Sequence, residues 1–153
     1  MKAIKGFRGE YFFLSNFAPC KKNYELGEYN AISYEGYFYP TVEHAFQAAK
    51  TLSQGERKPI LMAETAKEAK SLGRRVTLRK DWEDVKIEIM YNLLWQKFIL
   101  PEYREKLLAT GDAILIESNN WNDKFWGICH GAGENNLGKL LMRIREELRS
   151  YEF

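Results

Sequence analysis

The sequence predicts an α+β fold that is mainly helical, with a small β-sheet or hairpin near the N-terminus. Two observations lead to this prediction. Aromatic and β-branched residues cluster between residues 24 and 39, as is typical of strands. From residue 42 onward, apolar residues recur at helical spacing between good capping residues. The length of 153 residues suits one domain with its own hydrophobic core, so we expect a single domain over residues 1–153.

The composition argues against several classes of protein. Apolar residues make up 45% and aromatic residues 14% of the chain, which is not the composition of a disordered protein. The net charge of +2 is too small to indicate nucleic-acid binding by itself. There is no apolar run of membrane-spanning length and no signal-peptide pattern at the N-terminus, so we expect no membrane contact. Two cysteines, Cys20 and Cys129, make no disulfide framework, which fits a cytoplasmic protein.

The expected β structure lies in the first forty residues. Residues 5–17 should form a short strand and then a loop at Ser15 and Asn16, which are either turn formers or ligand contacts. Glu35-Gly36 separates two aromatic runs and predicts the turn of a hairpin. This hairpin would lead the chain directly to a helix beginning at Val42.

The stretch over residues 39–50, YPTVEHAFQAAK, is the centre of the predicted fold. Thr41 is a good N-cap, and the alanines that follow favour a helix. Glu43 and Lys50 are about two turns apart and share a helix face with Gln47. This face is either a solvated charged surface or a site where the Lys50 ammonium approaches a group held near Glu43.

The rest of the chain is predicted to be largely helical. Start signals, stop signals and apolar periodicity mark helices at residues 59–63, 65–73, 82–99, 101–110 and from 136 onward. The longest is expected to be the core helix because it carries two apolar stripes: Trp82, Val85, Ile89 and Leu93, and Ile87, Met90, Leu94 and Phe98. A brief buried strand is expected at residues 114–116. A basic segment with Arg74, Arg75, Arg79 and Lys80 is either a surface linker or the rim of an anion site.

Two motifs near the C-terminus do not qualify as sites. Residues 133–139 match most of a phosphate-loop pattern, but Leu140 stands where a Ser or Thr would hold magnesium. We retain only the expectation that exposed amides at the start of the last helix receive a phosphate or ribose hydroxyl. Cys129-His130 has no spacing typical of zinc, and a cysteine nucleophile would need a base that the sequence does not reveal.

Asp123 and Trp126-Gly127 lie in an Asn- and Gly-rich stretch between residues 117 and 135. This stretch is longer than a plain connection needs, and long ordered loops often carry function. Asp123 either presents a carboxylate beside the aromatic wall of Trp126 or forms an Asx-turn next to a core tryptophan.

Taken in order, these stretches resemble the NADAR/YbiA-like family of N-glycosidases. The matching segments extend from about residue 7 to residue 149 and are residues 14–17, 39–50, 69–73, 79–82, 97–98, 108–111, 123–127 and 136–142. One departure is local: residues 128–130, ICH, fill a loop that is often richer in glycine among relatives. This departure bears on the choice of substrate more than on the reaction.

The resemblance implies a compact YbiA-like domain that cleaves the N-glycosidic bond between C1 of a (phospho)ribose and a base or amine nitrogen. Proposed substrates in the family are ADP-ribose attached to guanine and ribosylamino-pyrimidine intermediates of riboflavin synthesis. The expected partner is therefore a small nucleotide or ADP-ribosyl substrate, or alternatively ADP-ribosylated nucleic acid. No cofactor and no metal are expected. A non-catalytic module that binds ADP-ribose or nucleotides is the alternative function.

The resemblance also implies roles for individual residues. Glu43 or Asp123 would stabilise positive charge on the sugar or move a proton. Lys50, as a neutral amine, would attack C1 of the opened sugar and form a Schiff base. We expect these three catalytic residues to converge on one cleft. The expected substrate-binding residues are Ser15, Asn16, Gln47, Gly127 and Asn136, together with Phe17, Tyr39 and Trp126 as candidates for stacking on the base.

Overall fold

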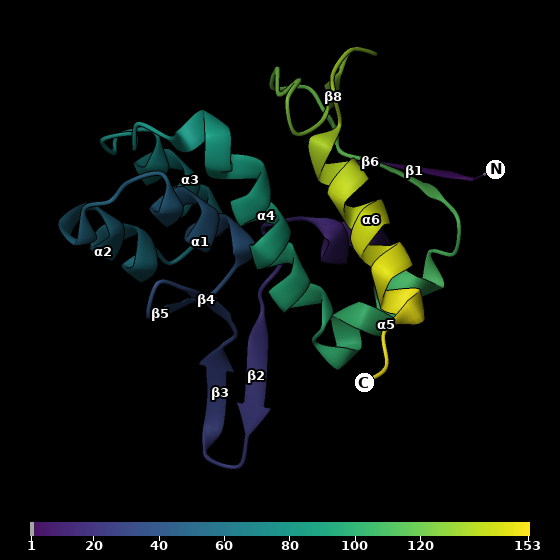
Figure 1. Cartoon of the computed structure of the whole chain (residues 1–153), viewed down its shortest axis with the longest axis horizontal. Helices are drawn as coiled ribbons and strands as arrows, with labels where there is room; N and C mark the ends of the chain where they lie inside the picture. Colours follow the sequence, from purple (N-terminus) through teal and green to yellow (C-terminus); the bar gives the residue numbers. More distant parts are fainter. Residues whose placement is uncertain (1) are drawn as a thin grey trace. The chain divides into compact units, whose positions relative to one another are not determined.

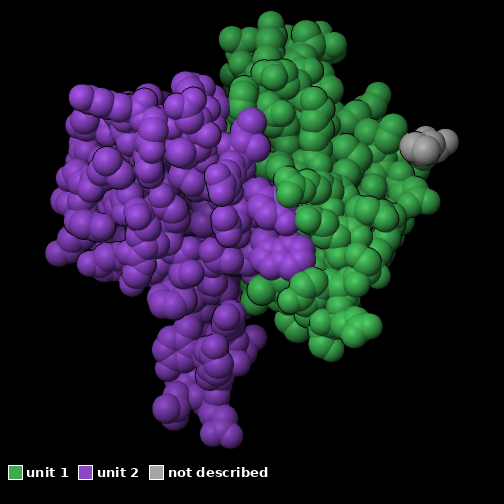
Figure 2. Space-filling view, viewed as in Figure 1, with its two compact units in different colours: residues 1–15, 98–153 green, residues 16–97 purple. Residues whose placement is uncertain are grey.

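The computed structural model describes residues 2–153. The chain forms two compact units, one of residues 16–97 and the other of residues up to 15 together with residues 98–153 (Figure 2). Helices predominate and the strands pair in small two-stranded sheets (Figure 1), which confirms the predicted fold class. No helix among the described residues is long and apolar enough to cross a membrane.

The unit of residues 16–97 begins with two hairpins. Strands β4 (Ile32–Tyr34) and β5 (Tyr37–Tyr39) are antiparallel, and the turn residues Glu35 and Gly36 have φ angles of 44° and 90°. Two residues with positive φ are typical of a tight hairpin turn, so the predicted hairpin is confirmed. A second hairpin, β2 (Lys21–Tyr24) with β3 (Gly27–Asn30), was not predicted. It is largely exposed and therefore lacks the alternation of buried and exposed residues that marks a strand.

Helix α1 (Val42–Ala49) begins where the sequence predicts, because the Thr41 hydroxyl accepts the His44 N–H at 3.0 Å. All residues of α1 are buried, and the helix packs against α2 and α3. The interpretation of its Glu43 face as a solvated surface is therefore wrong. Helix α3 (Ala66–Gly73) is also confirmed, and it starts after Thr65, which accepts the Glu68 N–H at 3.1 Å.

Helix α2 (Gln54–Met62) starts earlier than predicted, and Pro59 lies inside it rather than at its start. The Ser53 hydroxyl caps the helix by accepting the Glu56 N–H at 3.2 Å. Ser53 and Glu56 have the spacing of a capping box, so this start signal was present in the sequence upstream of the proline.

Helix α4 (Trp82–Phe98) is the long core helix that the sequence predicts, although both of its apolar stripes are only partly buried. Val85 and Ile89 of the first stripe are half-buried, and Ile87 of the second is 44% exposed, because the buried arc of the helix is narrower than expected. Lys97 was not predicted to be buried, yet its side chain is 0% exposed. Removal from water lowers the Lys97 pKa to about 8.

The second unit combines the two ends of the chain. Strand β1 (Ala3–Lys5) pairs in parallel with β6 (Ile114–Ile116), which confirms the buried strand expected at residues 114–116. The strand expected from residue 5 lies slightly earlier, and a short 3-10 helix, η1 (Gly9–Leu14), follows it in place of a plain loop.

Two α-helices in this unit match the sequence analysis. They are α5 (Pro101–Ala109) and α6 (Asn136–Ser150), and α6 packs on both α5 and β6. Two very short parallel strands, β7 (Ser118–Asn119) and β8 (Ile128–Cys129), frame the stretch that contains Asp123. Cys20 and Cys129 are free thiols, and both are buried.

Candidate functional site

In the unit of residues 16–97, the candidate site is built on one face of α1. Gln47 Nε2 donates a hydrogen bond of 2.9 Å to Glu43 Oε1. Both side chains are buried, with 7% of Glu43 and 4% of Gln47 exposed. The amide orientation is fixed by this bond, because Oε1 of Gln47 would repel the carboxylate in the reverse orientation. Gln47 Oε1 is consequently a buried acceptor that has no hydrogen-bond partner within residues 2–153.

Gly73, at the end of α3, allows Gln47 to take this position. A Cβ atom at residue 73 would lie 1.9 Å from Gln47 Oε1 and 2.9 Å from Gln47 Cβ. Both distances are far below van der Waals contact, so the two helices can approach this closely only with glycine at position 73. The contact between α1 and α3 thus sets the environment of Glu43.

The predicted binding residues Asn16 and Phe17 lie at the start of α1. The Asn16 carbonyl accepts the Glu43 N–H at 3.1 Å. The Asn16 side chain donates weakly to Met90 Sδ at 3.6 Å, and its Oδ1 is buried without a hydrogen-bond partner in the described part of the chain. The Lys70 ammonium lies 6.0 Å from the centre of the Phe17 ring. The structure therefore brings Asn16, Phe17, Glu43 and Gln47 together.

Lys50 is half-buried at the C-terminal end of α1. Burial lowers the Lys50 pKa from its ordinary value, the Glu43 carboxylate raises it, and the cations Lys70, Arg74 and Lys86 lower it further. Each of these groups is thus close enough to act on the Lys50 ammonium. A lowered pKa increases the fraction of neutral amine, which is the form that attacks carbon.

Two other residues of the central stretch have structural roles. Tyr39 is 1% exposed, so its ring has no free face for a base, and the expected stacking role of Tyr39 is not supported. His44 lies within hydrogen-bond distance of the Ala63 carbonyl through Nε2 (3.0 Å) and of Thr41 Oγ1 through Nδ1 (2.7 Å). Burial lowers the His44 pKa, which favours a neutral imidazole that ties α1 to the end of α2.

Asp123 belongs to the other unit, where it forms the Asx-turn that was one of its two interpretations. Its Oδ1 accepts the backbone N–H groups of Phe125 at 3.2 Å and Trp126 at 2.9 Å. The Asn119 side chain brackets the Asp123 backbone, accepting its N–H at 3.1 Å and donating to its carbonyl at 2.9 Å. The Asp123 carboxylate is half-buried, so the turn does not by itself remove it from solvent.

Close packing and hydrogen bonds fix three other predicted binding residues of the same unit, Trp126, Gly127 and Ser15. The half-buried Trp126 ring meets the Phe125 ring edge-on, with centroids 4.8 Å apart. A Cβ at Gly127 would lie 2.1 Å from the Glu117 carbonyl oxygen, so glycine at this position serves the close crossing of two backbones. Ser15 is half-buried and ends η1, where its N–H donates to the Phe12 carbonyl at 2.9 Å.

The start of α6 does not offer the open amides expected from the sequence. The N–H groups of Asn136 and Leu137 donate to the carbonyls of Phe125 (3.1 Å) and Trp126 (3.0 Å). The Asn136 side chain also donates to the Phe125 carbonyl, at 3.0 Å. That expectation is therefore wrong for these two amides, because the preceding loop folds back onto the helix and satisfies them.

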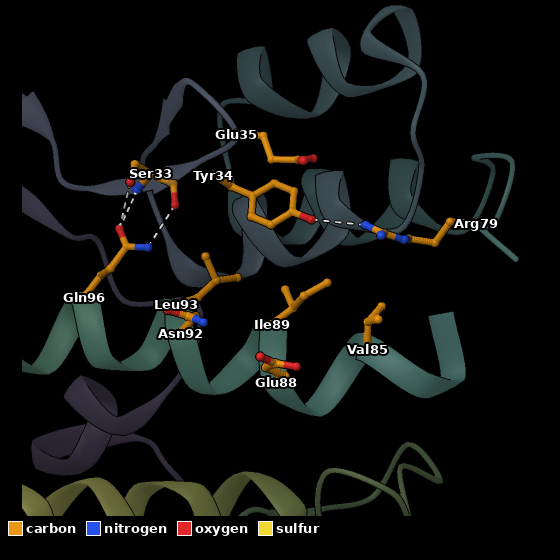
Figure 3. A pocket seen from close by; sticks show the side chains of 10 residues that line it. All are labelled: Ser33, Tyr34, Glu35, Arg79, Val85, Glu88, Ile89, Asn92, Leu93 and Gln96. Atoms are coloured by element: carbon orange, nitrogen blue, oxygen red, sulfur yellow. Dashed lines mark hydrogen bonds between the residues drawn. The ribbon is translucent and has the colours of Figure 1, made fainter. Parts of the chain in front are cut away.

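A separate cavity of about 360 Å³ lies between the β4–β5 hairpin and α4 (Figure 3). It is lined by Ser33, Tyr34, Glu35, Arg79, Val85, Glu88, Ile89, Asn92, Leu93 and Gln96. Of these, the sequence analysis considered only Arg79 for a site, as part of the rim of an anion site. Arg79 connects it to the candidate site, since its backbone N–H donates to the Lys50 carbonyl at 2.7 Å.

Arg79 is a structural residue rather than the rim of an anion site. Its guanidinium donates to both carboxylate oxygens of Asp81, at 2.6 and 3.1 Å, and to the Tyr34 hydroxyl at 3.1 Å (Figure 3 shows the bond to Tyr34). These bonds use all three guanidinium nitrogens within the fold, and the paired Nε and Nη2 donors that suit a phosphate are taken by the Asp81 carboxylate. For Arg79, the alternative of an anion rim is therefore not supported.

Comparison with known proteins identifies relatives that match most of the chain. The model of the NADAR domain matches residues 5–149. The chain is 40% identical over 147 residues to N-glycosidase Npun_R5314 of Nostoc punctiforme, covering 92% of this chain and 87% of that protein. It is 43% identical over 121 residues to N-glycosidase YbiA of Escherichia coli, covering 76% and 75% of the two chains. These matches include residues of both compact units.

Two further comparisons concern a longer protein and a solved structure. The riboflavin biosynthesis protein VVA0006 of Vibrio vulnificus is 36% identical over 143 residues, which cover 91% of this chain but only 36% of that protein. The NMR structure of the Escherichia coli protein YbiA matches with a TM-score of 0.81 and 36% identity, over 99% of this chain and 90% of that chain.

Proposed function

The chain belongs to the NADAR domain family, and we propose that it hydrolyses an N-glycosidic bond between C1 of a phosphorylated ribose and a base or amine nitrogen. Relatives that are 40% and 43% identical are named N-glycosidases. The observation that carries the proposal is the buried Glu43 carboxylate, held by Gln47 within electrostatic range of a half-buried lysine whose pKa is lowered.

Glu43 supplies negative charge where the reaction develops positive charge. Departure of the nitrogen from C1 leaves an electron-poor sugar carbon, which a fixed carboxylate stabilises best where water is excluded. Glu43 is 7% exposed and its Oε1 is positioned by Gln47, so little reorganisation is needed during the reaction. In its protonated form, the same group can instead donate a proton to the leaving nitrogen or to the ring oxygen and become the carboxylate.

Lys50 supplies the nucleophile in the first form of the mechanism. Its neutral amine attacks C1 of the opened sugar, the bond from C1 to the leaving nitrogen breaks, and that nitrogen takes up a proton. Water then hydrolyses the resulting imine and restores the free lysine. Burial and three neighbouring cations favour the neutral amine that this step requires.

In the second form of the mechanism, Lys50 only binds the substrate and water attacks C1. Glu43 or Asp123 then stabilises an oxocarbenium-like state. Glu43 is the stronger candidate because one oxygen of Asp123 already accepts two backbone N–H groups. Trapping of a covalent adduct on Lys50 distinguishes the two forms.

Two substrate classes follow from the proposal: ADP-ribose linked to guanine, and ribosylamino-pyrimidines related to riboflavin synthesis. The name of the Vibrio vulnificus relative favours the second class, although this chain spans only 36% of that protein. ADP-ribosylated nucleic acid is the macromolecular form of the first class. The alternative function is a module that binds ADP-ribose or nucleotides without cleaving them.

The test is to incubate the purified protein with a panel of N-ribosides and read out product masses. We expect release of the free base or amine by the wild type and by Glu64→Gln, which changes an exposed carboxylate outside the site, but not by Glu43→Gln. Binding of an N-riboside without cleavage would establish the binding module instead. The panel is repeated after exhaustive chelation, where we expect full activity, and recovery only with an added divalent ion would contradict this.

A further inference from the structure

We propose that Lys70 and Arg74 form an anion subsite that binds the phosphate or diphosphate of the substrate beside Glu43 and Lys50. This inference rests on the proposed function and assigns residues to the recognition of the phosphorylated part of the substrate. The basic segment over residues 74–80 contains both Arg74 and Arg79. Because the Arg79 guanidinium is bonded to Asp81 and Tyr34 within the fold, we assign only Arg74 of these two residues to the subsite.

The first observation is the position of Lys70 and Arg74 on α3. They are one helical turn apart, because Arg74 follows the last residue of α3 and keeps helical backbone angles of −72° and −14°. Gly73, next to Arg74, contacts the Gln47 side chain directly. This end of α3 therefore lies against the face of α1 that carries Glu43 and Lys50.

The second observation places Lys70 on the other border of the same site. Its ammonium lies 6.0 Å from the centre of the Phe17 ring. Phe17 follows Asn16, whose carbonyl accepts the Glu43 N–H at 3.1 Å. Lys70 is thus linked through Phe17 to the segment that contacts the first turn of α1.

The third observation is an excess of positive charge around Lys50. Lys70, Arg74 and Lys86 all lower the Lys50 pKa, whereas Glu43 is the carboxylate that raises it. Lys86 is paired with Glu83 at 2.5 Å, so its charge is partly compensated. A phosphate group beside these side chains would accept charge-assisted hydrogen bonds from the guanidinium and ammonium groups.

A purely structural role would be expected to act differently. Basic side chains in the last turn of a helix interact favourably with its dipole, and Lys70 is in the last turn of α3. In that role, Lys70 would affect the stability of the protein, and its substitution would have the same effect on the kinetics of every substrate. An anion subsite instead predicts that the effect of a substitution depends on whether the substrate carries a phosphate.

The first experiment uses two substrates that differ only in the phosphate: a cleavable N-riboside with its 5′-phosphate and the same compound without it. For the double variant Lys70→Gln/Arg74→Gln, we expect KM for the phosphorylated compound to rise by about tenfold or more, as loss of a charged hydrogen bond predicts. We expect KM for the phosphate-free compound to stay close to the wild-type value. Loss of two cations that lower the Lys50 pKa can also reduce kcat, but this reduction should be the same for both compounds. An equal change in KM for both compounds, or no change in KM for either, would overturn the proposal.

The matched control is Lys67→Gln/Arg75→Gln, which removes the same two charges from neighbouring positions. Lys67 and Arg75 are both exposed, and neither is among the groups that lower the Lys50 pKa. We expect wild-type kinetics with both substrates. The same rise in KM for the control variant would show that only the overall charge of the protein matters, and would reject the subsite.

The second experiment measures binding of inorganic pyrophosphate by calorimetry and needs no turnover. Binding to the wild type and to the control variant, with loss in Lys70→Gln/Arg74→Gln, supports the subsite even if no N-riboside is cleaved. In that case the glycosidase proposal fails and the subsite stands. Binding that is absent from the wild type, or equal in all three proteins, overturns the subsite and leaves the glycosidase proposal untouched.

Discussion

Gln47 and Glu43 are joined by a 2.9 Å hydrogen bond from Nε2 to Oε1, one turn apart on a helix whose residues are all buried. A carboxylate removed from water is costly unless it is hydrogen-bonded or paired with a cation. Gln47 supplies the hydrogen bond, and Lys50 lies within electrostatic range. This relationship makes Glu43 the residue on which the proposed chemistry most directly depends.

Glu43→Gln should lower kcat by about 100-fold or more, the usual range for loss of an acid–base group. The amide keeps the size of the side chain but removes its charge and its proton transfer. Thermal unfolding should show a folded protein, so a loss of activity can be assigned to chemistry. Wild-type kcat in this variant would remove Glu43 from the mechanism.

Gly73→Ala should damage the site indirectly. The new methyl group would lie 1.9 Å from Gln47 Oε1, so Gln47 must move and release Glu43. Overpacking of this kind costs about 1–3 kcal/mol of the free energy of unfolding. The double variant Gly73→Ala/Gln47→Ala should recover stability but not kcat, because the space is restored while the hydrogen bond is lost. Full activity of Gly73→Ala would show that Gln47 does not need to hold Glu43.

Lys50→Arg should abolish cleavage if Lys50 is the nucleophile, because arginine stays protonated and cannot attack carbon. Borohydride added during turnover should trap a ribosyl adduct whose mass maps to Lys50. In the wild type, the rate should rise with pH as Lys50 loses its proton, at a pH below that of an ordinary lysine because its pKa is lowered. Substantial activity of Lys50→Arg with no adduct would favour water as the attacking group.

Asp123→Asn separates the two possible roles of Asp123. Asparagine keeps an oxygen that can accept the N–H groups of Phe125 and Trp126, so the turn and the melting temperature should be retained. If the negative charge serves catalysis, kcat should nevertheless fall by about 100-fold. An unchanged kcat would show that Asp123 serves only to form the turn and has no role in catalysis. The expected convergence of Asp123, Glu43 and Lys50 on one cleft remains a prediction, which a structure with a bound substrate analogue would test.

Lys97→Met should remove part of the pH dependence of stability, because it removes a buried ammonium whose pKa is lowered. The Lys97 pKa is lowered from 10.5 to about 8, which corresponds to roughly 3 kcal/mol of the free energy of unfolding across this interval. Between these two pKa values the unfolded chain keeps a proton that the folded protein has lost, so wild-type stability rises with pH, whereas the stability of Lys97→Met should not. Denaturant unfolding from pH 7 to 10.5 measures this difference. The same pH dependence in both proteins would contradict it, and the exposed substitution Lys80→Met should behave like the wild type.

Features that depend on near neighbours in the sequence were predictable. Thr41 and Thr65 cap helices through residues three positions later, and Glu35-Gly36 forms a turn with its own backbone. Pairing of Ala3 with Ile114 has no local signal, because each strand is only three residues long and its partner is distant in the chain. The error at Pro59 was avoidable, since Ser53 already carried a start signal.

The sequence allowed us to predict which residues on α1 form the candidate site, but not how deeply they are buried. Helical spacing places Glu43 and Gln47 within hydrogen-bond reach, whereas their burial depends on Gly73 from a different helix. Burial of Tyr39 is likewise a tertiary effect that its neighbours in the sequence do not reveal. Lys70 was missed, although its spacing of four residues from Arg74 on a predicted helix could have indicated a two-cation cluster.

The order of residues in the two units has a consequence for biosynthesis. Residues 16–97 are continuous, so this unit can begin to fold as soon as it leaves the ribosome. Ala3 precedes this unit in the chain, yet its partner Ile114 is synthesised only after the whole unit. Strand β1 therefore cannot pair with β6 while the middle of the chain folds. Because this pairing closes a very long loop, we expect it to be a late step of folding during synthesis.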